Sequence, residues 1–336
     1  MRRAIAAALS VALIASPTPL LAWGVTAHRV INRVAVNALP PEVPPFVKAQ
    51  IDWIGVRSVT PDSWRTANEP FLKIDEDPNH GWFREQFAFM RVIPRSRYEF
   101  VVALYDEFLK IKESDPERAA LTNVRWTGTL PYAAVEAFER IKVAMRQYRT
   151  AVAAKQDTQF IERDAAFYIG WLGHYTGDGA QPLHTSIHHD GWAGPNPKGY
   201  TTEPRVHGRF ESQYVDLIAL QESDIAARVP AARRLADPFS AVLEHLDRAH
   251  TRVEQVYELD KSGAYQQKDN ETARQLVYTC TTDGATLLRD LVYTAWVASA
   301  STSESSAQAM QPINPRHPQY NPATGSAPAP KPGSQR

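Results

Sequence analysis

Two pairs of potential metal ligands lie in the middle of the chain. In the segment GHYTGDGAQPLH, His174 and Asp178 are four residues apart, and His184 follows a Gly/Pro break. In the segment HGRFE, His207 and Glu211 are again four residues apart. Residues at positions i and i+4 share one face of a helix, and imidazole nitrogens with carboxylate oxygens are ligands that zinc prefers. Two such pairs predict a multinuclear metal site and therefore a metalloenzyme.

The start of the chain has the pattern of a secretory signal peptide. Two arginines precede an apolar run over residues 4–15, prolines follow, and Ala22 supplies a small residue at the end. The apolar run is too short for a good membrane anchor. We therefore predict a signal peptide over residues 1–22, cleaved between Ala22 and Trp23. The mature protein is expected to be secreted or periplasmic, without a transmembrane segment.

These motifs together carry a resemblance to a known family. A mature chain that begins at Trp23, has His28 five residues later, and then shows HxxxD–x5–H and HxxxE resembles the zinc-dependent phospholipase C and S1/P1 nuclease superfamily. In that family the amino group and carbonyl of the N-terminal Trp ligate zinc, so cleavage of the signal would create a ligand. The resemblance covers roughly residues 23–300.

The resemblance implies three Zn²⁺ ions in one cleft. Each ion would lack a full set of protein ligands, which leaves the open position that catalytic zinc requires. The first ion would be held by Asp62, His80, His174 and Asp178, the second by Trp23, His28 and the other oxygen of Asp178, and the third by His184, His207 and Glu211.

Features around these ligands differ between the two branches of the superfamily. In PDSWR, Arg65 follows Asp62 by three residues, which resembles the nuclease pattern. There the Asp orients the attacking hydroxide, and the Arg supports charge on the phosphate through its fork of donors. The short spacing from the N-terminal Trp to the first His and the long interval between His184 and His207 are also nuclease-like. Glu211 and the HYTGD segment instead resemble the phospholipase branch.

The balance favours an S1/P1-type nuclease that acts on single-stranded nucleic acid and leaves 5′-phosphate products. The family mechanism implies that two neighbouring zinc ions lower the pKa of a shared water and the third stabilises the leaving oxygen. Trp82 and Phe83, directly after His80, are candidates to stack an unpaired base, with core packing as the alternative for both. Two other functions remain open: a phospholipase C-type hydrolase, which would need an apolar rim and a headgroup pocket, and a zinc-binding protein without catalysis.

Composition agrees with an exported enzyme and gives no further sign of a partner. The chain has 37 basic and 37 acidic residues, so net charge does not indicate a nucleic-acid groove. Bound zinc would supply positive charge locally, where an anionic phosphate must lie. Cys280 is the single cysteine, which excludes an intramolecular disulfide. No obligate protein partner is evident.

Apolar residues recur with the helical period in seven segments, whereas alternating strand patterns are scarce. The expected helices lie within residues 27–38, 97–113, 131–153, 158–177, 208–222, 237–259 and 267–299. Residues 185–206 are rich in Gly, Pro, Asn and His and predict an ordered loop. Residues 301–336 are rich in Pro, Ser and Ala and predict a disordered tail. We therefore predict an all-α fold, a single multi-helix domain over residues 23–300 with a trinuclear zinc cleft.

Overall fold

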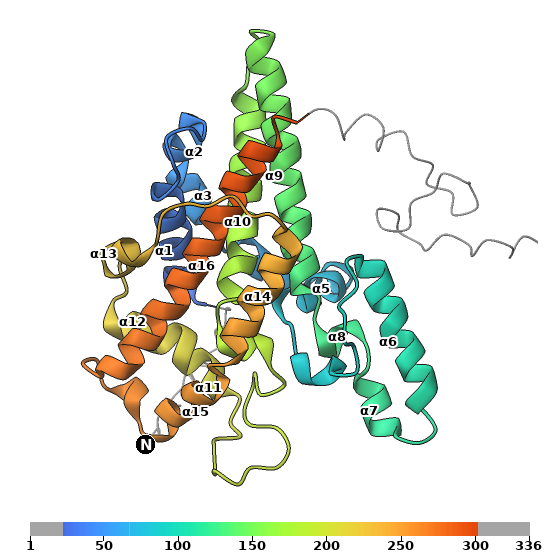
Figure 1. Ribbon diagram of the computed structural model, residues 1–336. Helices are drawn as coiled ribbons and strands as arrows, with labels where there is room; N and C mark the ends of the chain where they lie inside the picture. The colour runs from blue at the N-terminus through green and yellow to red at the C-terminus, as the bar shows by residue number, and fades with distance from the viewer. Residues whose placement is uncertain (1–22, 67, 302–336) are drawn as a thin grey trace, which may run out of the picture.

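The computed structural model describes residues 23–66 and 68–301, and this part of the chain is all-α (Figure 1). Its sole β feature is an isolated bridge between Trp82 and Gly128. The predicted fold class is therefore confirmed. The predicted signal peptide and all but the first residue of the predicted tail lie outside the described residues.

Both long and short helices occur along the chain. The α-helices are α1 (Val25–Asn37), α2 (Pro45–Ala49), α3 (Ile51–Arg57), α4 (Thr60–Thr66), α5 (Pro70–Glu76), α6 (Arg97–Ile111), α7 (Pro116–Leu121), α8 (Val124–Thr127), α9 (Leu130–Ala153), α10 (Gln159–Asp178), α11 (Arg205–Gly208), α12 (Val215–Ile218), α13 (Glu222–Ile225), α14 (Pro238–His250), α15 (Val253–Lys261) and α16 (Glu271–Ala298). The other helical turns are η1 (Asp77–His80), η2 (Arg84–Phe87), η3 (Pro182–Thr185), η4 (Arg209–Tyr214), η5 (Ala226–Arg228) and η6 (Ala264–Gln266), of which η4 is π-helical and the rest are 3₁₀.

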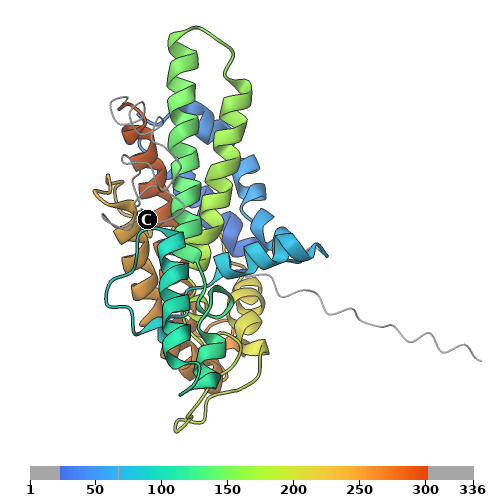
Figure 2. The same ribbon diagram turned by 90° about the vertical axis from the view of Figure 1, so that its right-hand side faces the viewer.

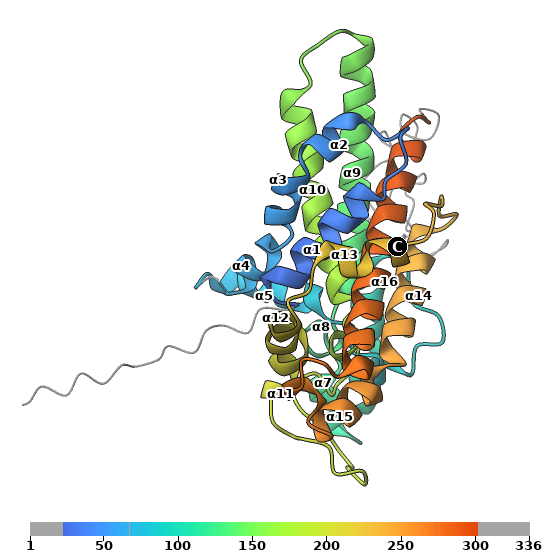
Figure 3. The ribbon, with the colours of Figure 1, turned by 90° about the vertical axis from the view of Figure 1, so that its left-hand side faces the viewer.

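The core is formed by α1, α9, α10 and α16, which pack against one another. Figure 2 shows α9 and α10 as an antiparallel pair whose tip extends beyond the other helices. Figure 3 shows α1 and α16 alongside this pair. On α1, the predicted apolar stripe of Val30, Ile31, Val34 and Ala35 is buried, as an amphipathic helix in contact with a core requires. None of the helices in the described residues is long and apolar enough to span a membrane.

Each predicted helical segment contains helix, although two of them are divided. The segment 237–259 is interrupted after His250, giving α14 and α15, and the segment 208–222 contains the π-helical η4. The predicted loop is confirmed, since no helix lies between Thr185 and Arg205. The helices α2 to α5, α7 and α8 were not predicted because one or two turns carry too few residues to show a period.

Two glycines of the GHYTGD segment allow α1 to lie directly on α10. A Cβ atom added to Gly173 would lie 1.9 Å from Oδ1 of Asn32, and one added to Gly177 would lie 2.9 Å from Nδ1 of His28. Both α1 side chains are fully buried. The small residues therefore fix how closely His28 approaches the metal-ligand candidates of α10.

We expect Gly173→Ala to destabilise the protein because its methyl group overlaps Asn32. Overpacking of this kind costs about 1–3 kcal/mol, which chemical denaturation would measure as a lower free energy of unfolding. Gly55→Ala is the matched control, since Gly55 is also helical and buried but its added Cβ would meet the Arg33 side chain at an ordinary 3.4 Å. Equal stability of the two variants would show that the α1–α10 contact tolerates a larger residue.

Candidate metal centre

Three groups of buried His and acidic side chains meet where α1, α4, η1, α10, η3, α11 and η4 come together. Within each group, one ligand atom per residue lies within 4.8 Å of every other. The groups are His28 with His174 and Asp178, Asp62 with His80 and His174, and His184 with His207 and Glu211. The structure thus brings together all eight predicted ligand side chains, which come from segments far apart in the sequence.

The carboxylate of Asp178 belongs to the first group and also contacts His80 of the second, while His174 is common to both groups. Its Oδ1 lies 3.3 Å from Nε2 of His28, and its Oδ2 lies 2.9 Å from Nδ1 of His80 and 3.2 Å from Nε2 of His174. The side chain is fully buried at the last residue of α10. One oxygen of Asp178 therefore faces each of two adjacent sets of donors, which is the geometry of a bridging carboxylate.

For His174, His207 and His184, a backbone carbonyl determines which ring nitrogen is directed into the site. Nδ1 of His174 donates to the carbonyl of Ser58 at 2.8 Å, Nδ1 of His207 donates to His189 at 2.9 Å, and Nδ1 of His184 donates to His80. With Nδ1 protonated, the neutral ring presents the Nε2 lone pair to the interior. Nε2 of His184 and Nε2 of His207 are 3.1 Å apart. Two facing lone pairs at that distance repel unless a proton or a metal ion is shared between them.

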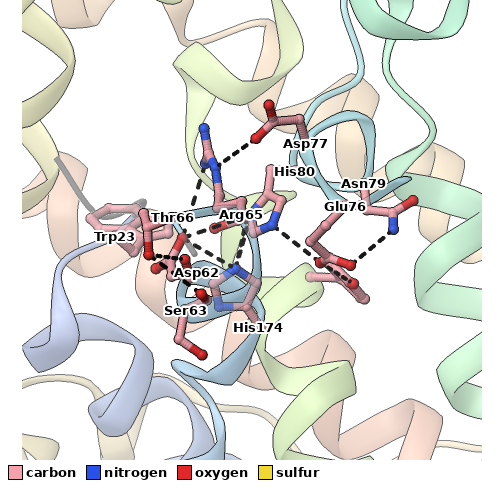
Figure 4. Close-up of polar contacts among 12 residues, drawn as sticks. Trp23, Asp62, Ser63, Arg65, Thr66, Glu76, Asp77, Asn79, His80 and His174 are labelled. Atoms are coloured by element: carbon pink, nitrogen blue, oxygen red, sulfur yellow. Dashed lines mark hydrogen bonds and ion pairs between the residues drawn. The ribbon is translucent and has the colours of Figure 1, made fainter. Parts of the chain in front are cut away.

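Several ligand atoms in this region are buried without any hydrogen bond. They include both carboxylate oxygens of Asp62, Oε1 of Glu211 and both ring nitrogens of His28. The nearest nitrogen atoms to Asp62 Oδ1 in ion-pair range belong to His80 and His174, at 3.8 Å, and to Arg65, at 4.0 Å (Figure 4). A buried carboxylate without partners costs several kcal/mol. These nitrogen and oxygen donors fit divalent metal ions, which would satisfy the atoms that the protein leaves unpaired.

The carboxylates strongly alter the protonation of the imidazoles in the metal-free protein. Burial alone would lower the pKa of His174, but the charges of Asp178 and Asp62 raise it to about 9. Burial also opposes the charged form of His207, whereas Glu211 and Asp190 raise its pKa to about 10. Despite burial, His207 and His184 lower the pKa of Glu211 to about 2. The metal-free site therefore holds protons in the positions where metal ions would bind.

A hydrogen-bonded chain behind His80 was missed by the sequence analysis. Nε2 of His80 lies 3.2 Å from Oε1 of Glu76, which accepts a 2.6 Å hydrogen bond from the Tyr175 hydroxyl. Glu76 also accepts from Asn79 at 3.3 Å. A carboxylate behind a ligating imidazole orients the ring and increases its basicity. The spacing of Glu76 and His80, four residues apart, was the available signal, and α5 with η1 places them on one side of the turn.

Gln181 is a second supporting residue that the sequence analysis missed. Its Nε2 donates to Oε2 of Glu211 at 3.0 Å, while its Oε1 accepts from the backbone of Leu183. The side chain is fully buried. Gln181 therefore links the turn that carries His184 to the carboxylate of the third group.

The nitrogen of Trp23 lies beside this third group. It was expected next to His28, but in the structure it donates to Oε2 of Glu211 at 3.0 Å. The Trp23 ring is fully buried and its centroid lies 5.4 Å from that of Phe210. In the uncleaved chain this nitrogen is a peptide amide, so its predicted role as a zinc ligand still depends on cleavage after Ala22.

A cleft of about 390 Å³ opens over the metal-ligand candidates. Beyond the ligands its lining contains charged groups of both signs and aromatic rings. The lining residues are Arg65, Asp77, Gly81, Phe83, Arg125, Trp126, His189 and Asp190 with His80, His184, His207 and Glu211. His189 lies in the predicted loop over residues 185–206, and its ring stacks on that of Phe83, with centroids 4.6 Å apart.

One predicted substrate contact is corrected by the structure. Trp82 has no exposed surface and packs against Phe87 and Phe100, with ring centroids at 4.4 Å and 5.2 Å. It therefore belongs to the hydrophobic core and cannot stack a base. Phe83, the other candidate, lines the cleft.

Comparisons with known proteins give little beyond this geometry. No family model matches the chain, and no curated protein matches it. Among solved structures, the crystal structure of alpha-toxin isolated from avian strain SWCP of Clostridium perfringens is similar at 13% sequence identity with a TM-score of 0.40. The match covers 84% of this chain and 66% of the toxin chain, just under two thirds of its length. A likeness this distant assigns neither a family nor an activity to this chain.

Proposed function

We propose that the protein is an exported zinc-dependent phosphodiester hydrolase, and that it is a nuclease acting on single-stranded nucleic acid. The observation that carries the proposal is the buried Asp62 carboxylate, which has no hydrogen-bond partner on either oxygen and stands between two imidazoles and Arg65. A buried carboxylate that makes no hydrogen bond adds little to stability. Its retention is explained by a bound cation and by a reaction that needs an oriented carboxylate.

The proposed ligand sets are those that the resemblance implies, and each contains residues that the structure groups together. Asp178 would serve two ions, one with Asp62, His80 and His174 and one with His28 and the new amino terminus at Trp23. The Trp23 nitrogen, which donates to Glu211 in the uncleaved chain, would exchange that partner for the metal ion. His184, His207 and Glu211 would hold a third ion, with Gln181 orienting the carboxylate. Bound zinc would supply Lewis-acid polarisation of the phosphate and a nucleophile at neutral pH.

Two charged residues of the chain would act on the substrate directly. The free oxygen of Asp62 is suited to accept a hydrogen bond from the attacking water and so to orient it toward phosphorus. Arg65 lines the cleft, where its guanidinium is held by Asp77 at 3.5 Å. Its remaining donors are suited to the non-bridging phosphate oxygens, whose charge is greatest in the transition state.

The lining of the cleft favours nucleic acid over phospholipid. Arg65, Arg125, Phe83 and Trp126 offer guanidinium groups for phosphates and aromatic rings for bases. One observation supports the phospholipase alternative, because Phe71 and Ile74 of α5 are 85% and 65% exposed. Helix α5 leads directly into η1 with Asp77 and His80, and an apolar helix beside the site could contact a lipid surface.

The first test is made on protein secreted from a host that removes signal peptides. Its N-terminal residue and zinc content are determined, and single-stranded DNA, RNA and phosphatidylcholine are assayed side by side. The proposal expects Trp23 at the terminus, about three zinc ions, and cleavage of single strands that EDTA abolishes. Release of phosphocholine without cleavage of nucleic acid would instead support the phospholipase function.

Asp62→Asn is expected to affect activity far more than stability. In EDTA the variant should lose little stability, because neither oxygen of the Asp62 carboxylate makes a hydrogen bond. With zinc, thermal unfolding should show a smaller gain than in the wild type, and kcat should fall by about 100-fold or more. Asp52→Asn is the control, since Asp52 is exposed on α3. A large loss of stability in the metal-free Asp62→Asn protein would show that the Asp62 carboxylate stabilises the fold without a metal ion.

Zinc binding is expected to release protons and to strengthen as pH rises. His174 and His207 have metal-free pKa values of about 9 and about 10, so both carry a proton at neutral pH that must leave before zinc binds. Calorimetry at about pH 7 in buffers of different ionisation enthalpy should give about two released protons from these residues. Affinity should increase up to roughly pH 9–10, and equal zinc affinity at about pH 6 and 9 would exclude protonated imidazoles in the metal-free site.

A further inference from the structure

The short helix α8 brings an arginine and a tryptophan to the cleft that the catalytic role does not use. Arg125 and Trp126 both line the cleft, and Trp126 is 38% exposed despite being a large apolar side chain. The guanidinium carbon of Arg125 lies 5.5 Å from the centroid of the Trp126 ring. Figure 1 shows α8 between the α6–α7 pair and the helical core.

The backbone after α8 is attached to the segment that carries His80. The Phe83 amide donates to the carbonyl of Thr127 at 2.8 Å, and the Thr129 amide donates to Pro78 at 2.7 Å. Between these bonds, Gly128 has a φ of 77° and a Cβ there would lie 1.9 Å from the carbonyl oxygen of Gly81. Only glycine permits this approach. The position of α8 is therefore fixed relative to the metal-ligand candidate His80.

The two arginines of the cleft differ in their pairing. Arg65 lies within 3.5 Å of Asp77 and 4.0 Å of Asp62, so carboxylates already offset its charge. Arg125 has no carboxylate within ion-pair distance among residues 23–66 and 68–301, and its guanidinium contacts the face of Trp126. An exposed arginine of this kind keeps its donors available for an anion from solution.

The geometry points to a nucleotide subsite on α8, next to the scissile phosphate. Arg125 binds a phosphate that flanks the one being hydrolysed, and Trp126 stacks the base attached to it. Stacking on an aromatic ring accepts any base. The Arg125 guanidinium beside that ring needs a second phosphate next to the one being hydrolysed, and a polynucleotide supplies one. A phospholipid carries one phosphodiester and no base, so this subsite selects nucleic acid. The inference rests on the proposed nuclease function.

The test compares substrates that possess or lack each recognised group. Wild type, Arg125→Ala, Trp126→Ala and Trp126→Phe are assayed on bis(p-nitrophenyl) phosphate, on the dinucleotide TpT, on a single-stranded oligothymidylate, and on an oligomer of abasic sites with the same backbone. Arg91→Ala serves as the matched control for loss of one positive charge, because Arg91 is exposed and does not line the cleft. Equal unfolding midpoints would show that the exposed substitutions leave the fold intact.

Each variant has a distinct expected pattern. Arg125→Ala should raise KM about tenfold on both oligomers, lower the salt dependence of log KM by about 0.7, and leave TpT and bis(p-nitrophenyl) phosphate unchanged. Trp126→Ala should raise KM about tenfold on oligothymidylate but not on the abasic oligomer. Trp126→Phe should retain most of the wild-type affinity because the ring is kept.

Two results would overturn the subsite, and they are distinguishable. Suppose that the wild type cleaves oligothymidylate. If the Arg125 and Trp126 variants then lose activity equally on all four substrates, or keep wild-type activity on all four, α8 does not bind the flanking nucleotide. If the wild type hydrolyses bis(p-nitrophenyl) phosphate or phosphatidylcholine but no nucleic acid, the proposed nuclease function fails and the subsite fails with it.

Discussion

The arrangement of the site depends on the buried carboxylate of Asp178, which contacts three of the candidate imidazole ligands at 3.3 Å or less. Asp178 ends α10, the helix that packs on α1, α9 and α16 at the centre of the molecule. Its two oxygens face imidazoles from α1, η1, η3 and α10 itself, and its ionisation depends on these imidazoles and on burial. Burial would raise the pKa of Asp178, but His174 and His184 hold it well below its ordinary value. A carboxylate kept charged in the core at this cost requires positive partners on both oxygens, and the helices that supply them must lie at fixed separations.

The separations between these helices are set by residues that do not bind metal or substrate themselves. Gly173 and Gly177 permit the close contact of α10 with α1, and carbonyls of Ser58 and His189 hold the rings of His174 and His207. Elsewhere the site contains unpaired polar atoms that oppose folding. A protein retains such atoms where function requires them and compensates through the surrounding core. The π-helical η4 that carries Glu211 fits this view, because π turns inside helices are frequent at functional sites.

The sequence allowed the long helices and the ligand side chains to be predicted, but not the contacts between distant segments. Helical periods are local, so the α9–α10 and α16 helices could be inferred from apolar stripes, and His174 with Asp178 from their four-residue spacing. Trp82 and Phe83 show the limit. They are adjacent, yet one lies in the core and the other lines the cleft, because burial is decided by which distant element covers each face. The hydrogen bond of Trp23 to Glu211 joins residues 188 positions apart, and no local pattern encodes it.

Metal ligands and substrate-binding residues also differ in how far a local sequence pattern reveals them. Side chains that bind cations must satisfy ligand geometry, so their types and spacing are recognisable in one sequence. The wall that faces the substrate has no such requirement and can be built from any segment that the fold brings to the cleft. In this chain α8 lies on that wall, in the long interval between His80 and His174, and its Arg125 and Trp126 carry no motif. If the flanking nucleotide binds there, specificity resides in the part of the chain whose function is least evident from its sequence.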